Sequence, residues 1–271
     1  TDPARLGDAA LVARAVTDYF RAVLDATHDL VACCKPQAAF FEALGLPGLE
    51  ALAALMAHSR GLGVPVVLDA KRGDIGSTAE AYAAAYLTDG AFAADALTVN
   101  PFLGLDTLEP FLAAAEAGGR GLFVLVRTSN PGSAALQEAE LASGEALYQR
   151  LADALAERSR ALAAGPGGYT VLGAVAGATA PAALAELRRR LPRSLLLVPG
   201  YGAQGGSADD VAAAFDAAGR GAVVNASRSL TYGAGALGAR TFAEVGAAAR
   251  AATLRMRDDL AAALQRRAAS A

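Results

Sequence analysis

Lysine is almost absent from this chain, and the two lysines it keeps stand where chemistry would need them. Of its 24 basic residues only Lys35 and Lys71 are lysines, which leaves 22 arginines. Arginine is a planar, permanently charged fork, whereas lysine is a compact ammonium that can release a proton. Both lysines come at the end of strand-like sequence, so we expect them at positions where a permanently charged arginine could not replace them. The alternative is that codon bias replaced lysine by arginine and that these two lysines remain by chance.

Acidic residues accompany Lys71 at a spacing that suits a strand end. Asp69 and Lys71 alternate, so in a strand both side chains point to the same face. Asp74 follows in the next loop, before a helix whose expected start, Ser77-Thr78-Ala79-Glu80, has a capping-box pattern. In (β/α) barrels the active site lies at the carboxyl ends of the strands. The pattern therefore predicts a charged catalytic site, with a surface salt-bridge cluster as the alternative.

A second cluster suits an anion. Residues 199–206 are rich in glycine, and Ser207 is the expected N-cap of the next helix. Converging backbone N–H groups and a helix N-terminus favour phosphate, and barrel enzymes often bind it after their last two strands. We therefore predict Gln204 and Arg228 as phosphate ligands, Arg228 through a bidentate pair. Two glycine-rich turns with a solvated arginine are the alternative.

Two other strand ends are polar. Asn100 ends one apolar run, and Ser129 lies in the turn 127–132 after the next. Ser129 could hydrogen-bond the polar edge of a substrate, although serine is also a common turn residue. His28 and His58 lie in or beside helical sequence, and no cluster has metal-ligand spacing. No G-x-S-x-G elbow is present, so neither a metal site nor a serine hydrolase is indicated.

Short apolar runs alternate with helical segments along the chain, which predicts a parallel sheet covered by helices. Each run is apolar throughout, as in strands buried on both faces. The expected strands are 30–35, 64–69, 96–100, 121–127, 171–175, 195–200 and 222–225, and the main helices 8–25, 79–87, 142–162, 182–191, 208–218 and 241–267, with a loop at 232–238.

Seven strands leave a (β/α)₈ TIM barrel one strand short. We expect this first strand to precede Thr1, because the chain enters helical sequence at Asp8; an open doubly wound sheet is the alternative. No linker divides residues 1–271, so we expect one domain. Apolar residues make up 54% and the net charge is −3. With no apolar run of the ~18 residues of a membrane span, we expect a cytoplasmic protein without nucleic-acid or membrane partners.

Together these residues resemble orotidine 5′-phosphate decarboxylase, in particular its bacterial second subgroup. The similarity spans nearly the whole chain in the right order, and Asp-x-Lys-x-x-Asp-Ile is its most specific part. The matching segments are Cys34–Glu42, Asp69–Thr78, Thr98–Gly104, Thr128–Ser133, Gly173–Thr179 and Pro199–Gly206.

The resemblance implies a homodimeric (β/α)₈ barrel that converts orotidine 5′-phosphate to UMP without metal or cofactor. The family's charged tetrad falls on Lys35, Asp69, Lys71 and Asp74, with Lys71 as proton donor to the ring carbon that loses CO₂. Arginine, with a pKa of about 12.5 or more against about 10.4 for lysine, would be the poorer donor. Asp74, Ile75 and Thr78 are implied to complete the neighbouring subunit's site.

The resemblance also assigns the substrate contacts. Ser129 is implied to contact the pyrimidine and Gln204 and Arg228 the phosphate, with Asn100 and Gly202 also at the substrate. Residues 201–206 are then the loop that closes. The family's ribose-binding Asp ends the first strand, and we do not transfer that role to Asp2.

Two other functions fit parts of the sequence. A Mg²⁺-dependent sugar-phosphate decarboxylase or aldolase of the same suprafamily shares Asp-x-Lys-x-x-Asp, and metal dependence would identify it. An inactive nucleotide-binding barrel would bind UMP without turnover. The segments around Asn100 and Ser129 favour the pyrimidine enzyme.

Overall fold

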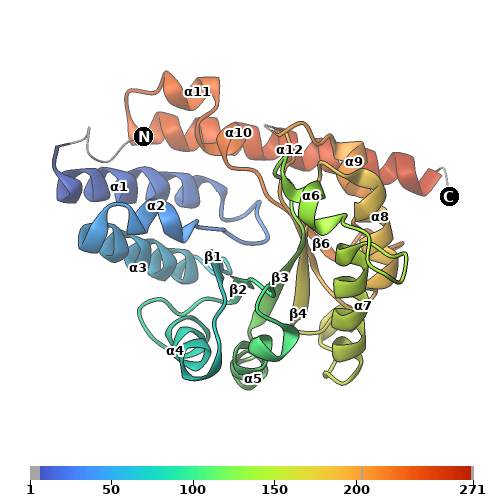
Figure 1. The fold of residues 1–271 in the computed structure, drawn as a ribbon. Helices are drawn as coiled ribbons and strands as arrows, with labels where there is room; N and C mark the ends of the chain where they lie inside the picture. Colours follow the sequence, from blue (N-terminus) through green and yellow to red (C-terminus); the bar gives the residue numbers. More distant parts are fainter. Residues whose placement is uncertain (1–6, 203, 270–271) are drawn as a thin grey trace.

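A parallel β-sheet forms the middle of the molecule, and helices cover its outer face (Figure 1). The computed structural model describes residues 7–202 and 204–269. Neighbours in the sheet are also neighbours along the chain, so each strand is followed by a crossover to the next, as the alternating sequence pattern predicts. The strands are β1 Val67–Arg72, β2 Ala96–Val99, β3 Gly121–Arg127, β4 Leu172–Ala176, β5 Leu196–Val198 and β6 Ala222–Val224.

The expected strand at residues 30–35 is only an extended segment. Cys34 forms a parallel bridge with Val66, and Gln37 forms one with Asp69. Pro36 lies between them and has no N–H to donate to a ladder, and a helix begins at Ala38. The segment still runs beside β1, so Lys35 is at the sheet edge where the sequence predicts it.

The first and last long helices lie side by side, because α12 packs against both α1 and α9 (Figure 1). The helix α1 also packs against α3. The helices are α1 Ala9–Thr27, α2 Ala38–Glu42, α3 Gly45–Gly61, α4 Gly76–Leu87, α5 Glu109–Gly118, α6 Ser133–Gln137, α7 Leu147–Arg160, α8 Pro181–Arg190, α9 Ala208–Ala212, α10 Arg228–Thr231, α11 Ala234–Leu237 and α12 Phe242–Ala269, with 3₁₀ turns at Leu105–Leu108 and Pro166–Gly168.

The two faces of the sheet bury separate sets of side chains. On the outer face, residues such as Leu68, Leu97 and Val124 join the large core beneath the helices. The inner face holds a second cluster with one member from each of five strands, namely Val67, Ala96, Phe123, Val175 and Leu197. Period-2 alternation of side chains produces these two layers.

The inner cluster shows that the sheet is curled. Cys33, in the segment before β1, and Val223, on β6, both pack against this cluster. The two edges of the sheet therefore reach the same interior, as in a barrel whose inside is filled by side chains. In the described part no strand pairing joins β6 to residues 33–37. The observed architecture is therefore part of a barrel; the expected first strand and Asp2 lie outside the described residues.

Two local predictions are wrong and one is confirmed. The helix α4 begins at Gly76 without a side-chain cap, so Ser77 and Glu80 are already helical. Gly76 adopts a φ of +51°, which glycine tolerates and which starts the helix before Ser77. The expected loop 232–238 contains the short helix α11. Ser207 does cap α9, accepting a hydrogen bond from the Asp210 N–H at 3.2 Å.

None of the helices within residues 7–202 and 204–269 has the length and apolar character that a membrane span requires.

Candidate active site

A buried carboxylate between two ammonium groups forms the centre of the site. Lys35 Nζ donates to Asp69 Oδ2 at 2.8 Å, and Lys71 Nζ donates to Asp69 Oδ1 at 2.5 Å. Asp69 is 8% exposed, whereas the Lys71 side chain is 45% exposed. The two lysines of the chain thus meet at one aspartate, and the Lys71 side chain is still partly accessible from outside.

A threonine missed by the sequence analysis fixes this cluster to the sheet. The Thr98 hydroxyl donates to Asp69 Oδ1 at 3.1 Å. It also accepts from the N–H groups of Ala70 at 3.0 Å and Lys71 at 2.9 Å. Thr98 is 1% exposed, and a polar residue inside the otherwise apolar strand β2 was the signal that could have indicated it.

The backbone at Lys71 is unusual and explains how the cluster forms. Lys71 has a φ of +49°, a value that no other described non-glycine residue shares. The pairing of β1 with β2 shifts register between Leu68 and Arg72. Left-handed backbone costs energy in a non-glycine residue and often occurs at functional sites. Here it bends the strand end so that Lys71 Nζ reaches the carboxylate two residues before it.

The charges around Asp69 favour its ionised form. Burial would raise the pKa of this carboxyl group, but the attraction of Lys35 and the hydrogen bonds from Lys35 and Lys71 outweigh it, so the pKa is lowered. Asp69 is therefore a fixed negative charge at neutral pH, and it holds both ammonium groups in place.

Arg72 links β1 to α2, the helix that follows Lys35. Its guanidinium donates to the Glu42 carboxylate and, at 3.3 Å, to the Tyr86 hydroxyl. The same group lies 5.4 Å from the ring centroid of Tyr82 and 5.7 Å from that of Tyr86. This outward-facing contact joins the two segments that supply Lys35 and Lys71, and the sequence analysis did not identify it.

Asp74, Ile75 and Thr78 do not join this cluster. Asp74 Oδ1 accepts from the N–H of Ile75 at 2.8 Å, and no ion pair between described residues includes Asp74. Ile75 is 63% exposed, and Thr78 is exposed on the first turn of α4. No hydrogen bond or ion pair between described residues joins these three residues to Lys35, Asp69 or Lys71.

Ser129 and Gln204 meet at Gly200, where the loops after β3 and β5 approach each other. A Cβ at Gly200 would lie 3.1 Å from Gln204 Oε1 and 3.2 Å from the Cβ of Ser129. A Cβ at Gly177, after β4, would lie 2.8 Å from the Ser129 nitrogen. Glycine at both positions therefore lets three consecutive strand ends converge.

Arg228 begins α10 directly after β6, and its side chain is exposed. The glycine-rich loop after β5 is close to α10 here, because a Cβ at Gly202 would lie 3.8 Å from Ser229 Oγ. Asn225, at the end of β6, has a buried side-chain oxygen without a hydrogen-bond partner in the described structure. The predicted phosphate ligands are thus on adjacent loops, although no contact joins Gln204 to Arg228 directly.

Asn100 lies between these regions and has a structural contact. Its side-chain oxygen accepts from the N–H of Phe102 at 3.0 Å, and its own N–H donates to the Arg72 carbonyl at 2.8 Å. A Cβ at Gly73 would lie 2.7 Å from the Asn100 carbonyl oxygen, which explains the glycine between Lys71 and Asp74.

All these groups lie at the carboxyl ends of the strands. A buried carboxylate with two ammonium groups can stabilise and then protonate a negative centre, and the glycine-rich loops with Arg228 can hold an anion. Among the described residues no group of three or more His, Cys, Asp or Glu side chains could hold a metal ion.

Comparisons with known proteins agree with this geometry. A family model described as the orotidine 5′-phosphate decarboxylase / HUMPS family matches residues 12–238. The orotidine 5′-phosphate decarboxylase of Deinococcus radiodurans is 50% identical over 242 residues, covering 89% of this chain and 84% of that protein. The same enzyme of Rhodopirellula baltica is 49% identical over 226 residues, covering 82% and 74%.

Solved structures give the same result. The structure of Leishmania donovani OMP decarboxylase has a TM-score of 0.75 and 35% identity, covering 93% of this chain and 89% of that chain. The Methanocaldococcus jannaschii enzyme, solved with the inhibitor BMP, has a TM-score of 0.65 and 19% identity, covering 90% and 93%. The second likeness concerns the fold alone.

Proposed function

This chain belongs to the orotidine 5′-phosphate decarboxylase family, and from that premise we propose that its lysine–aspartate cluster converts orotidine 5′-phosphate to UMP. It is a carbon–carbon lyase of pyrimidine biosynthesis. The observation that carries the assignment of the chemistry is the contact of Lys35 and Lys71 with the buried carboxylate of Asp69. The relatives at about half identity are decarboxylases of this substrate, which favours this function over a sugar-phosphate enzyme.

Lys71 acts as the proton donor in this proposal. The bond between ring C6 and the carboxylate breaks, its electron pair stays on C6, and CO₂ leaves. The Lys71 ammonium then gives one proton to C6 and becomes a neutral amine. Its 45% exposed side chain and its three donor hydrogens, one of which binds Asp69, support this role.

Asp69 and Lys35 supply preorganised electrostatics. Asp69 is ionised because its pKa is lowered, and it faces the substrate carboxylate while it holds the Lys71 ammonium near C6. Lys35 donates to the other carboxylate oxygen of Asp69 and holds that carboxylate in place. Fixed charges aimed at a developing anion are commonly the largest single contribution to an enzyme's rate.

The loops after β3, β5 and β6 bind the rest of the substrate. Ser129 contacts the pyrimidine, and Gln204, Arg228 and the backbone at Gly202 bind the phosphate. Asn100 borders the substrate through the turn that it caps. The convergence of Ser129 and Gln204 at Gly200 supports this arrangement. Phosphate binding provides remote energy that can order residues 201–206 over the ring.

The active unit in this proposal is a homodimer. Asp74, Ile75 and Thr78 reach into the partner's site, because they do not join the cluster of their own chain. Exposed apolar side chains in the segments that follow residues 33–37, β1 and β2 support an interface, since Phe40 is 76%, Ile75 63% and Phe102 75% exposed. Large exposed apolar groups are typical of surfaces that bind another protein.

The complete fold in this proposal is a single-domain (β/α)₈ barrel of the cytoplasm, with one more strand between residues 33–37 and β6. Two observations support closure: both sheet edges reach the inner cluster, and α12 packs against α1.

An ultraviolet assay with EDTA present tests the function. The protein should convert orotidine 5′-phosphate to UMP without added metal, and Lys71→Ala should abolish turnover while the fold and UMP binding persist. Activity that requires Mg²⁺ would indicate a sugar-phosphate type of enzyme, and appreciable activity of Lys71→Ala would exclude Lys71 as the donor. UMP binding by the wild type without turnover would indicate a binding protein.

A further inference from the structure

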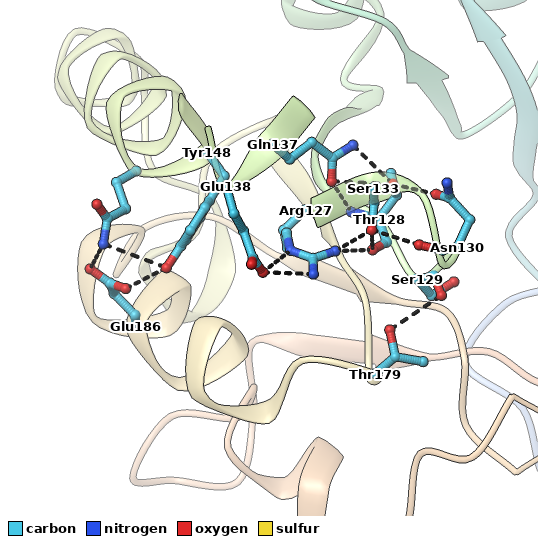
Figure 2. Close-up of polar contacts among 11 residues, drawn as sticks. Arg127, Thr128, Ser129, Asn130, Ser133, Gln137, Glu138, Tyr148, Thr179 and Glu186 are labelled. Carbon is cyan, nitrogen blue, oxygen red and sulfur yellow. Dashed lines mark hydrogen bonds and ion pairs between the residues drawn. The ribbon is translucent and has the colours of Figure 1, made fainter. Parts of the chain in front are cut away.

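Arg127 is a buried arginine at the carboxyl end of β3, next to the loop that carries Ser129 (Figure 2). The residue is 7% exposed. Its Nε and Nη2 donate to Glu138 Oε1 at 3.0 and 2.7 Å. Its Nη1 donates to the Thr128 carbonyl at 2.6 Å and to Ser133 Oγ at 2.5 Å. One guanidinium thus connects both ends of the loop 128–133 to a carboxylate.

The loop is held by further bonds around this centre. Ser133 Oγ, which accepts from Arg127, donates to the Asn130 carbonyl at 2.6 Å. The N–H of Thr128 donates to Gln137 Oε1 at 2.8 Å, and Gln137 Nε2 donates to Thr128 Oγ1 at 2.9 Å. Figure 2 shows these side chains gathered on one side of the loop. A loop fixed by buried, mutually bonded groups has few other conformations available.

Ser129 is the loop residue that this network leaves available to a ligand. Its carbonyl accepts from Thr179 Oγ1 at 3.2 Å, whereas no hydrogen bond joins its hydroxyl to another described residue. Gly177 and Gly200 lie close to it, since a Cβ on either would come within 3.2 Å of a Ser129 atom. The main chain at Ser129 is therefore fixed, and its hydroxyl is not committed to the protein.

We propose that Arg127 is a positioning residue for pyrimidine recognition, which it controls by holding Ser129 in register with the strand ends. The inference rests on the proposed function, in which Ser129 contacts the base. Arginine suits this role because its planar fork reaches a carbonyl, a hydroxyl and a carboxylate at once. Lysine presents its donors from a single point and cannot reproduce this geometry.

The network can lose Arg127 without leaving a buried charge. The Glu138 side chain is 44% exposed, so its carboxylate can be hydrated in the absence of the guanidinium. Arg127→Met, which keeps the length of the aliphatic stem, should therefore fold. The substitution removes the hydrogen bonds from Arg127 to the loop 128–133.

A double-mutant cycle with Ser129 tests the proposal. Arg127→Met should lower kcat/KM for orotidine 5′-phosphate about 10- to 100-fold, mainly through KM, as expected when a substrate-binding group is displaced. In the Ser129→Ala background the same change should lower kcat/KM by less than about twofold, because its effect passes through a hydroxyl that is no longer present. If Arg127→Met does not fold, Arg127→Lys takes its place in the same cycle. This variant keeps the positive charge but lacks the planar guanidinium.

Arg188 provides the matched control. It is equally buried at 8% exposure, and it donates to the carbonyls of Gly221 and Ser194 at 2.9 Å each, which precede β6 and β5. Arg188→Met should lower stability and leave kcat/KM of the folded enzyme unchanged. Effects of Arg127→Met and Ser129→Ala that simply multiply, or an unchanged kcat/KM in Arg127→Met or Arg127→Lys, would overturn the positioning role. A wild type without turnover would instead refute the proposed function.

Discussion

At the scale of single residues, the proposed chemistry depends on one aspartate that two lysines contact. Asp69 is buried, and burial alone would favour its neutral form. The contacts at 2.8 and 2.5 Å with Lys35 and Lys71 reverse that preference. The scarcity of lysine identified both lysines as candidate site residues, and strand alternation predicted that Asp69 and Lys71 share a face. The left-handed backbone of Lys71 and the hydroxyl of Thr98 were not predictable, because both depend on how β1 pairs with β2.

Asp69→Asn should reveal this carboxylate in the pH dependence of stability. The pKa of Asp69 is lowered by folding, so its ionisation adds stability above its ordinary pKa of 3.8, and that contribution is lost as pH falls through the lower folded value. The free energy of unfolding of the wild type relative to Asp69→Asn should therefore be constant near pH 7 and decrease in acid. Urea unfolding of both proteins between pH 7 and 3 measures it. A difference that stays constant or grows in acid would contradict the lowered pKa.

Arg228→Ala should weaken the binding of phosphate in particular. A hydrogen bond to a charged group contributes about 1.5–3 kcal/mol, so the affinity for UMP should fall about 10- to 100-fold, with a matching rise in KM. The affinity for uridine should not change, since it lacks the phosphate. Calorimetry with both ligands measures this, with Arg220→Ala, before β6, as the control. Equal losses for UMP and uridine would remove Arg228 from the phosphate site.

At the scale of elements, apolar runs predicted seven strands; six of them form, and residues 30–35 are only an extended segment. Boundaries failed where backbone geometry overrode sequence preference, as at Gly76, which starts α4 before the capping-box pattern. The side-chain contacts that hold the loops were also not predicted. Examples are the ion pair of Arg127 with Glu138 and the hydrogen bond of Tyr201 to Asp259, which each join separate segments of the chain. A single sequence contains no signal for such pairs.

The glycine-rich loop after β5 is anchored to α12 by one of these contacts. The Tyr201 hydroxyl donates to Asp259 Oδ2 at 2.6 Å. Burial, followed by the hydrogen bond and the charge of Asp259, raises the pKa of Tyr201 to about 12. Tyr201→Phe should therefore cost about 1 kcal/mol of stability at pH 8. It should also raise KM, because the loop proposed to bind phosphate loses its anchor.

The pH dependence of this cost provides the check. A raised pKa means that the tyrosine adds stability below its ordinary pKa of 10.0 and loses it as pH rises toward about 12. Urea unfolding at pH 8 and pH 11 should show the difference between wild type and Tyr201→Phe becoming smaller at the higher pH. An equal or larger difference at pH 11 would mean that the hydroxyl does not stabilise the folded chain through Asp259.

At the scale of the whole molecule, the described chain has one complete charge cluster and one segment that does not take part in it. Lys35 and Lys71 both contact Asp69, whereas the one hydrogen bond of the Asp74 side chain among the described residues is with the N–H of Ile75. Ile75 beside it is 63% exposed. The family resemblance implied a tetrad of Lys35, Asp69, Lys71 and Asp74 whose last member acts in the neighbouring subunit, and within this chain Asp74 is set apart from the other three because the chain turns into α4 at Gly76.

Subunit mixing tests whether Asp74 acts in the partner's site. Lys71→Ala and Asp74→Ala should each be inactive as pure dimers. After exchange, half of the dimers are mixed, and each mixed dimer has one site with an intact Lys71 and an intact Asp74. About a quarter of the wild-type activity should therefore return in a two-fold symmetric dimer. The matched control mixes Lys71→Ala with Asp69→Ala; these two residues touch within one chain, so no intact site can form and no activity should return. No recovery in the test pair, after exchange is verified by mass spectrometry, would show that Asp74 works within its own subunit. Recovery in the control would show that Lys71 and Asp69 do not serve one site within one chain.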